Sequence, residues 1–594
     1  MDTGLCATWF RDLLTGKSHA STHHDTHPPR LAPLLAPARL GDDSADVGLA
    51  SGPYRSGPGH LDRRRQFRFR HRRQLVRGCG SGLDKLVLRP TSGQTTVTLE
   101  RPNETSPYLI SGGLTFEDAA QSYLLDVKEG AYLGILGPVT NSSGVTQQFN
   151  VSGGAGGVIS FIELQGETGS NVIYTAGENG RVRLRTSVPE NSASFVLDGG
   201  RLEYSGSGVL ELGSLTGTGT LAYELNGAET GTIRLGGFGT SDTVEVLGAT
   251  IAQVGALTLE KVGAGTLIMT GSNGYSGGTR ILGGTLQFGQ GSFDSPLVGN
   301  VYTGDSEDSG RLAFGYEGDT SYSGVISGAG DLAILDGAVT LSGMNTFTGL
   351  TSISEGATLA LTGQGRVNQS SGVEVNGALD VSGASSAAVK SISGSGIISV
   401  GGASLSLTDS TGSFAGNVTG TGGLSIDAGS LTLTGASDLT GQFGVGDAAS
   451  LTVGDGETSG WISANVLNYG ALTFDRSDGG TYSGRISGTG DITLTGGGSY
   501  ILTGENSNSG SVTISEGTSV QLGDGGATGR LGGSGPNSGS IANDGTLIIN
   551  RSSATTYAGV ISGGGNLHQI GSGRLTLNGV NSFSGGRASR PASC

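Results

Sequence analysis

The 594-residue sequence is poor in charged residues and in cysteine. Asp, Glu, Lys and Arg make up 14% of the chain, against roughly 25% in an average soluble protein. The 3 cysteines, Cys6, Cys79 and Cys594, lie near the two ends. Their placement excludes a disulfide scaffold or a CxxC metal site over most of the chain. No run of about 18 apolar residues occurs, so no transmembrane helix is expected.

Basic residues are scarce beyond residue 90. Residues 1–90 hold 15 of the 34 Lys and Arg but only 8 of the 50 Asp and Glu, which leaves a charge of -23 on residues 91–594. That balance argues against nucleic acid as a partner. The basic run at 60–73, HLDRRRQFRFRHRR, is surrounded by Pro-, His- and Arg-rich sequence without helical or strand periodicity. We therefore interpret residues 1–90 as a disordered leader or a mis-started or frame-shifted reading.

Glycine is abundant, with 113 residues, and the sequence repeats itself. Five segments align without gaps and share two glycines: LIMTGSNGYSG (267–277), VTLSGMNTFTG (339–349), LTLTGASDLTG (431–441), YILTGENSNSG (500–510) and LTLNGVNSFSG (575–585). A second segment recurs upstream of three of them, as TSYSGVISGAGDL from Thr320, TYSGRISGTGDI from Thr481 and TYAGVISGGGNL from Thr556. Spacings that divide into roughly 23 to 25 residues indicate the coils of a solenoid.

Apolar residues alternate with Thr and Ser within each coil, which indicates short strands with one face turned inward. The pattern is clear at Val339 and Leu341, Leu359 and Leu361, and Leu575 and Leu577. Glycine between the strands suits turns that need positive φ. Outside the first 90 residues no segment shows a sustained helical period. The sequence therefore predicts an all-β parallel solenoid of roughly 20 coils.

Two sets of recurring side chains invite a functional interpretation. Aromatic residues recur at Tyr275, Tyr322, Tyr482, Tyr557, Phe347 and Phe583. They suit either carbohydrate stacking or, as we prefer, a structural ladder on their own equivalents. Acidic or amide residues recur after each GxG, at Asp331, Asp491 and Asn566. They suit a calcium ladder or side chains that bond to their own turn, and the calcium nonapeptide pattern is missing.

The TLTLTGxNxFSG and YSGxISGxGxL segments resemble the passenger-associated repeat of autotransporters, the bacterial type V secreted proteins. The resemblance is clear over residues 255–586 and weaker back to about residue 100. It implies a right-handed parallel β-helix that is exported to the cell surface, with repeats that assist passage and folding. A signal peptide and the C-terminal translocator barrel of the family are not visible in the sequence.

A polysaccharide lyase or hydrolase is the alternative, because long β-helices also carry such clefts. His568 is the one histidine of the body and lies inside a repeat, so no Ser/His/Asp or histidine–metal arrangement is expected. Paired carboxylates stay open, with Glu163, Glu167 and Glu178 as candidates. The alternating Arg181, Arg183 and Arg185 predict a solvated outer face or, less favoured, a site for anionic polysaccharide.

The sequence thus predicts a leader at 1–90, an irregular β-helix start at 91–254, a repeat β-helix at 255–586 and an aberrant tail at 587–594. Its expected function is that of a surface-exposed or secreted passenger fragment, a stalk with adhesion as one role, and not an enzyme. No catalytic, cofactor-binding or metal-binding residue is assigned. The expected partners are an outer-membrane translocator barrel and host or surface glycans.

Overall fold

The computed structural model describes strands β1 to β5 and residues 113–589, apart from 117–121, 129, 166–167, 169–170, 186–192, 207, 225–229, 237–243, 255, 293–294, 385–386 and 533–538. Every regular element in these ranges is a strand. The described residues therefore contain no helix long and apolar enough to cross a membrane. The strands form a parallel β-solenoid of about 21 turns. This confirms the predicted fold class and number of coils, while the right-handed twist stays a prediction.

The chain divides into two compact units, which we describe separately. The first contains Met1–Gly206, Leu210–Gly213 and Gly219–Asn226, and the second contains Ser207–Val209, Ser214–Thr218 and Gly227–Cys594. Strands β15 (Gly208–Leu212) and β16 (Ser214–Glu224) contain residues of both. The predicted divisions at residues 90, 254 and 586 stay predictions.

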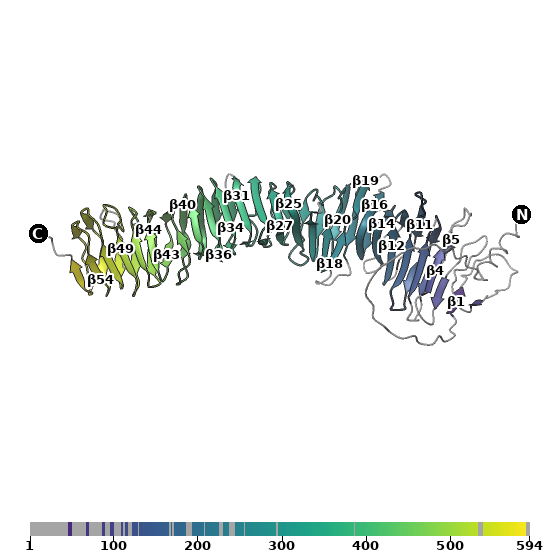
Figure 1. Cartoon of the computed structure of the whole chain (residues 1–594), viewed down its shortest axis with the longest axis horizontal. Helices are drawn as coiled ribbons and strands as arrows, with labels where there is room; N and C mark the ends of the chain where they lie inside the picture. The colour runs from purple at the N-terminus through teal and green to yellow at the C-terminus, as the bar shows by residue number, and fades with distance from the viewer. Residues whose placement is uncertain are drawn as a thin grey trace, which may run out of the picture. The chain divides into compact units, whose positions relative to one another are not determined.

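Three stacks of parallel strands build most of the first unit (Figure 1). The first stack contains β3 (Leu86–Arg89), β6 (Leu114–Phe116) and β9 (Val139–Asn141). The second contains β4 (Thr95–Leu99), β7 (Tyr123–Val127), β10 (Gln147–Val151), β12 (Val172–Gly177) and the start of β14 (Ala193–Tyr204). The third contains β5 (Tyr108–Ile110), β8 (Tyr132–Ile135), β11 (Ser160–Leu164), β13 (Gly180–Leu184) and the end of β14. Strand β1 (Ala45–Leu49) pairs antiparallel with β3 and with β2 (Phe67–Phe69). Strand β2 lies within the basic run, where no strand was expected.

The second unit is also built from stacked parallel strands. Its earlier strands are β17 (Thr230–Leu235), β18 (Val244–Leu247), β19 (Thr250–Val254), β20 (Ala256–Lys261), β21 (Thr266–Met269), β22 (Thr279–Ile281), β23 (Thr285–Gly291), β24 (Val301–Tyr302), β25 (Arg311–Tyr322), β26 (Ile326–Ser327), β27 (Leu332–Leu341), β28 (Thr351–Ile353), β29 (Thr358–Gly363), β30 (Val373–Val375), β31 (Ala378–Ala384), β32 (Ala387–Val389), β33 (Ile392–Ser393), β34 (Ile397–Gly401), β35 (Ser404–Leu407), β36 (Ser410–Phe414) and β37 (Asn417–Gly420). Its later strands are β38 (Gly423–Leu433), β39 (Ala436–Leu439), β40 (Gln442–Val453), β41 (Trp461–Ile462), β42 (Asn465–Asn468), β43 (Ala471–Asp475), β44 (Gly479–Tyr482), β45 (Ile486–Ser487), β46 (Asp491–Thr495), β47 (Ser499–Leu502), β48 (Val512–Ile514), β49 (Ser519–Leu522), β50 (Ile541–Asn543), β51 (Thr546–Ile549), β52 (Thr555–Tyr557), β53 (Ile561–Ser562), β54 (Asn566–Gln569), β55 (Leu575–Leu577) and β56 (Arg587–Ser589).

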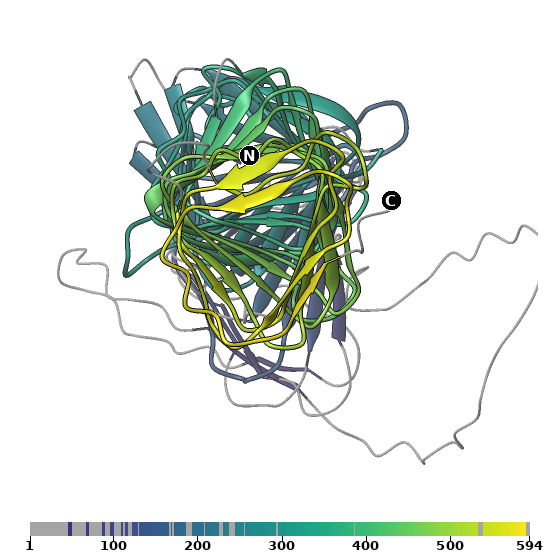
Figure 2. The ribbon, with the colours of Figure 1, turned by 90° about the vertical axis from the view of Figure 1, so that its left-hand side faces the viewer.

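Strands of the second unit pair in parallel with strands of the next coil, with local register shifts in some pairs, and Figure 2 shows these coils end-on. Ala471 of β43, for example, pairs with Asp491 of β46 in the next coil. Coil length is uneven, with a short step from Ala387 to its partner Leu405 and a much longer one from Val512 to Ile541. The strands still pair in parallel, residue for residue, in both coils.

The core is the row of inward side chains along each stack. Val339, Leu341, Leu359 and Leu361 are buried as predicted. In the first unit Tyr174 stacks between Phe149 and Phe195, with ring centroids 4.8 and 5.3 Å apart. Because these rings occupy one register position in three consecutive coils, each coil adds its ring to a continuous column.

The last repeat departs from the prediction in two ways. Leu575 and Leu577 are only half-buried, because β55 pairs with β52 alone among the described residues. The strand pattern also does not stop at Gly586. Arg587–Ser589 form β56, which pairs with β54, and the Arg587 guanidinium lies 4.5 Å from the Phe583 ring centre. The first three residues of the predicted tail therefore form a strand.

Candidate functional site

The two recurring segments lie one over the other in consecutive coils. A Cβ atom added to Gly343 would lie 2.1 Å from the carbonyl oxygen of Gly324, and one added to Gly349 would lie 2.3 Å from that of Gly330. Later copies repeat the arrangement, with Gly504 over Gly484, Gly510 over Gly490, Gly579 over Gly559 and Gly585 over Gly565. Only glycine lets two backbones approach this closely.

This close approach corrects the role predicted for the shared glycines. Gly343 and its equivalents in the other four copies do not have positive φ, so the requirement there is steric. Positive φ occurs at the glycine of the ISG triplet, with φ of 109° at Gly328, 106° at Gly488 and 104° at Gly563. The predicted turn role is confirmed at these three positions.

An asparagine two residues after the first shared glycine joins neighbouring coils. The backbone N–H of Ile326 donates to Oδ1 of Asn345 at 2.9 Å, and the N–H of Thr346 donates back to the carbonyl of Ile326 at 2.8 Å. We call such contacts asparagine bridges, and two more join Ile486 to Asn506 (2.7 Å) and Ile561 to Asn581 (2.8 Å). The side chain supplies the acceptor that a neighbouring strand would otherwise provide.

Asp331, Asp491 and Asn566 bind the following coil rather than their own turn, so the predicted local hydrogen bond is wrong. In each case Oδ1 accepts the backbone N–H of the residue after the second shared glycine, at 2.7 Å from Leu350, 2.8 Å from Ser511 and 2.8 Å from Gly586, respectively. No group of three His, Cys, Asp or Glu side chains in the described ranges is placed to hold a metal ion. The recurring Asp or Asn residue therefore forms a second link between coils.

The recurring aromatic side chains are buried, which supports the structural interpretation over carbohydrate stacking. The hydroxyl groups of three of them donate to carbonyls of the preceding coil: Tyr322 to Gly299 (2.7 Å), Tyr482 to Ala464 (2.6 Å) and Tyr557 to Gly539. Instead of stacking on their own equivalents, the Tyr322 and Tyr482 rings pack against Phe314 and Phe474. The predicted ladder of equivalents is wrong for these residues.

One copy of the upstream segment escaped sequence inspection. The sequence FAGNVTGTGGL, at 414–424, lies beneath the 431–441 segment, with Gly416 under Gly435 and Gly422 under Gly441. Ser437 occupies the asparagine position, and its hydroxyl donates to the carbonyl of Val418 at 3.0 Å. Phe for Tyr, Val for Ile and Gly for Asp hide this copy, and the spacing of its glycines is the signal that identifies it.

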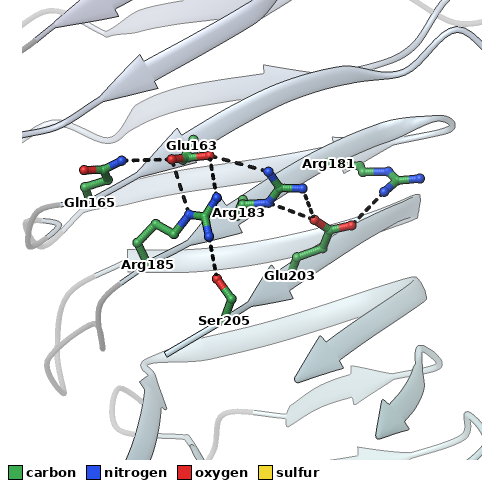
Figure 3. A network of polar contacts seen from close by, with 7 residues as sticks. All are labelled: Glu163, Gln165, Arg181, Arg183, Arg185, Glu203 and Ser205. Carbon is green, nitrogen blue, oxygen red and sulfur yellow. Dashed lines mark hydrogen bonds and ion pairs between the residues drawn. The ribbon is translucent and has the colours of Figure 1, made fainter. Parts of the chain in front are cut away.

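A different polar group occupies the outer face of the first unit (Figure 3). Strand register places Glu163, Arg183 and Glu203 at one position in three consecutive coils, so charge alternates along the stack. Nη2 of Arg183 lies 2.8 Å from Oε2 of Glu203, and its Nη1 lies 3.6 Å from Oε2 of Glu163. Arg181 and Arg185 flank Arg183 on the same strand face.

These flanking residues and Arg201 complete the group. Nη1 of Arg181 and Nε of Arg201 lie 2.8 and 3.0 Å from Oε1 of Glu203, and Nε of Arg185 lies 3.3 Å from Oε1 of Glu163. We call the six residues the arginine–glutamate cluster: Glu163, Arg181, Arg183, Arg185, Arg201 and Glu203. The arginine stripe thus lies on the solvated outer face that the sequence predicted.

Burial separates the two signs of charge in the cluster. The two glutamates are about 5% exposed, whereas the arginine side chains are 27% to 43% exposed. Burial alone would raise the pKa of Glu163, but hydrogen bonds from Gln165 and Tyr132 outweigh it and hold that pKa below its ordinary value. Burial and the bond to Glu163 raise the pKa of Tyr132 to about 12. Glu163 is therefore ionised at neutral pH and does not suit a general acid.

No contact joins Glu163 and Glu178, the two carboxylates proposed from sequence that the structure describes. Glu178 lies exposed in the turn between β12 and β13, and Glu167 lies outside the described residues. Glu203, which sequence inspection missed, is linked to Glu163 through Arg183. His568 is half-buried on β54, between Ile548 and Ala588 in neighbouring coils.

The second unit repeats the alternation on a smaller scale. Arg234, Glu260, Arg280 and Tyr302 share one register position in four consecutive coils. Oε2 of Glu260 lies 2.7 Å from Nε of Arg234, and its Oε1 lies 3.0 Å from Nε of Arg280. The Arg280 guanidinium lies 4.9 Å from the Tyr302 ring centre.

These features define a parallel β-solenoid whose coils are joined by recurring two-coil contacts. Segments 259–288, 336–363, 487–518 and 567–586 match the family model of the passenger-associated-transport-repeat. The chain is 29% identical over 611 aligned residues to the Adhesin BmaC autotransporter of Brucella suis biovar 1 (strain 1330); the alignment covers 80% of this chain and 18% of that protein. No solved structure is significantly similar to it. The repeats, the relative and the fold together support an autotransporter passenger domain.

Proposed function

We propose that this passenger is a non-enzymatic adhesive stalk of the bacterial cell surface, and that its repeats assist export and folding. The observation that carries the proposal is the pairing of the two motifs through asparagine bridges, whose asparagines lie in segments that match the passenger repeat. The relative is named an adhesin, which supports the adhesive role. Because the chain spans 18% of that protein's length, adhesion is a proposal for this segment alone.

The bridges suit a chain that folds as it emerges from a pore. Ile326 and Asn345 are 19 residues apart, and Ile486 and Asn506 are 20 apart. Closing such short loops costs little entropy, and a solenoid coil needs only its neighbour for stability. Each bridge therefore forms as soon as one further coil is available. An outer-membrane translocator barrel is the proposed export partner, with passage through the periplasm and exposure at the cell surface.

The polysaccharide-cleaving alternative has less support. A glycosidase needs one protonated carboxyl group and one carboxylate on either side of the scissile bond. Glu163 has a lowered pKa, and Arg183 lies between it and Glu203. The cluster thus offers ion-paired carboxylates rather than a general acid and a nucleophile.

Surface display of the chain tests the proposal. The chain, fused after Ser589 to an autotransporter barrel and given a signal peptide, is expressed in a non-adherent bacterium, with the empty barrel as control. Greater attachment to cultured host cells or matrix-coated surfaces is the expected result. Attachment equal to that of the empty barrel, despite display shown by surface protease treatment, refutes the adhesive role. The purified chain is also incubated with plant and bacterial polysaccharides, and any cleavage refutes the non-enzymatic role.

A further inference from the structure

We propose that the arginine–glutamate cluster of the first unit binds an acidic polysaccharide, a polymer whose sugars carry carboxylate or sulfate groups. This inference rests on the adhesive function proposed above and names its ligand class. It begins from an imbalance in the cluster, which has four arginines for two glutamates. The cluster therefore has a charge of +2 on a chain whose residues 91–594 have a charge of -23.

Hydrogen-bonding capacity shows the same imbalance. Each guanidinium carries five N–H donors, about 20 in total, whereas two carboxylates offer about 8 lone-pair sites. Intramolecular contacts with the glutamates therefore leave more than half of the donors to other acceptors. Ser205 takes one of them, from Nη1 of Arg185 at 3.0 Å. The arginine side chains are partly exposed, so donors remain accessible to water or an external anion, and carboxylate and sulfate oxygens match the fork of a guanidinium.

The depth of the charges favours an anionic ligand. The carboxylates of Glu163 and Glu203 are buried beneath the arginines, so an approaching molecule meets guanidinium groups first. Arg181, Arg183 and Arg185 alternate along one strand at a spacing of roughly 7 Å, and Arg201 lies one strand spacing, about 5 Å, from Arg181. This flat two-dimensional array suits an extended chain of charges rather than a single small anion.

Two aromatic rings extend the array at one end. Tyr132 and Phe161 occupy one register position in neighbouring coils, are half-buried, and have ring centres 6.0 Å apart. The Arg181 and Arg183 guanidinium groups lie 5.6 and 5.2 Å from the Phe161 ring centre. A sugar offers an apolar ring face beside its charged groups, which is the combination that this surface presents.

Nucleic acid fits this surface less well. Duplex DNA carries one charge per roughly 1.7 Å of its axis, so it would meet the acidic remainder of the passenger with strong repulsion. An acidic polysaccharide spaces its charges by whole sugars and intersperses hydroxyl groups. Such a polymer can bind a local array of four arginines without needing a long basic surface to balance its charge.

Direct binding of the purified chain tests the proposal. Polygalacturonate supplies carboxylate and dextran sulfate supplies sulfate, with neutral dextran as control and duplex DNA and anionic phospholipid vesicles as competing polyanions. The double variant R181Q/R201Q removes two exposed arginines and leaves Arg183 on Glu203. The control variant R280Q removes an exposed ion-paired arginine of the second unit.

We expect binding to at least one acidic polysaccharide, weakened by about tenfold or more in R181Q/R201Q because hydrogen bonds to charged groups are lost. As controls, R280Q should bind acidic polysaccharide with unchanged affinity, and neutral dextran should not bind. Absence of binding to both polysaccharides overturns the proposal, as does equal loss in R280Q or tighter binding of DNA or vesicles. If R181Q/R201Q fails to fold, R181K/R201K keeps the charges but loses the planar fork, and unchanged affinity of that variant also overturns the proposed guanidinium recognition.

Attachment of bacteria that display the same variants separates this inference from the adhesive function. Loss of attachment in R181Q/R201Q but not in R280Q supports both. Attachment that persists in R181Q/R201Q leaves adhesion intact and overturns the cluster as its glycan site. Attachment that is absent in the unmodified chain, together with polysaccharide binding in solution, refutes the adhesive function while the binding site stands.

Discussion

The asparagine bridge makes a quantitative prediction about one backbone amide. The buried N–H of Ile326 donates to Oδ1 of Asn345, and Asn345→Ala removes that acceptor. An orphaned buried donor costs about 1–3 kcal/mol. Nδ2 of Asn345 is itself buried without a hydrogen-bond partner, so its removal offsets part of the loss. We therefore expect the cost to lie near the lower end, at about 1–2 kcal/mol.

Asn506 provides a matched comparison. Its Oδ1 accepts the N–H of Ile486, and its Nδ2 donates to the carbonyl of Arg530 at 2.8 Å. Asn506→Ala thus removes two side-chain hydrogen bonds to backbone groups, where Asn345→Ala removes one. Asn506→Ala should therefore cost roughly twice as much stability as Asn345→Ala.

Hydrogen exchange of the full chain measures both effects. A cost of about 1–2 kcal/mol corresponds to about 5- to 30-fold faster exchange at Ile326, provided that exchange follows local opening. Met344→Ala is the control, because Met344 is adjacent to Asn345 and 43% exposed, and it should change stability by less than about 0.5 kcal/mol. Unchanged exchange at Ile326 in Asn345→Ala, or equal acceleration in Met344→Ala, refutes the bridge as a stabilising contact.

Three further substitutions test other parts of the structure. Gly343→Ala should lower the free energy of unfolding, measured by chemical denaturation, by about 1–3 kcal/mol, because its Cβ would lie 2.1 Å from a carbonyl oxygen. The control Gly318→Ala should be nearly neutral, because no atom lies within 4 Å of the added Cβ and Gly318 has no positive φ. Equal costs would contradict the steric argument. The folded-state pKa of Glu163 is lowered, so its contribution to stability is present above the unfolded pKa of about 4.5 and is lost as pH falls through the folded value. Glu163→Gln should therefore flatten the dependence of stability on acid pH. An unchanged pH profile of stability in this variant would contradict the prediction. Leu341→Asp places a charge at a fully buried position and should expose neighbouring coils to protease, so intact protection of those coils would show that their stability is independent.

Periodicity was sufficient to predict the strands and the solenoid. Alternation at Val339 and Leu341 places side chains inward whatever the coil length, because strand geometry alone determines it. The contacts between coils were harder to predict, since they depend on which residue lies above which. Because coil length varies along the chain, a fixed sequence spacing does not identify the residue above or below. Sequence inspection therefore assigned Asp331 to its own turn, although its partner is Leu350 in the next coil.

The arginine–glutamate cluster shows the same limit. The alternation of Arg181, Arg183 and Arg185 revealed that they share a strand face, but it did not reveal what lies above and below them. Glu163 and Glu203 each lie one coil away from Arg183, and neither belongs to a recognisable repeat copy. A search for oppositely charged residues one coil length away would have found both. Their burial and the lowered pKa of Glu163 required the full side-chain arrangement.

The low charge content of the chain follows from the same in-register stacking. Parallel coils place equivalent residues about 5 Å apart, so a charged residue kept in every coil would form a column of like charges with a repulsive energy that grows with each coil. The chain interrupts such columns by alternating sign, with Arg183 between Glu163 and Glu203, and Glu260 between Arg234 and Arg280. Thr and Ser are frequent at outward positions elsewhere in the strands, and they stack without this penalty. A concentration of arginine on one face is therefore costly in this architecture, and its presence in the first unit is better explained by an anion that it binds than by the needs of the fold.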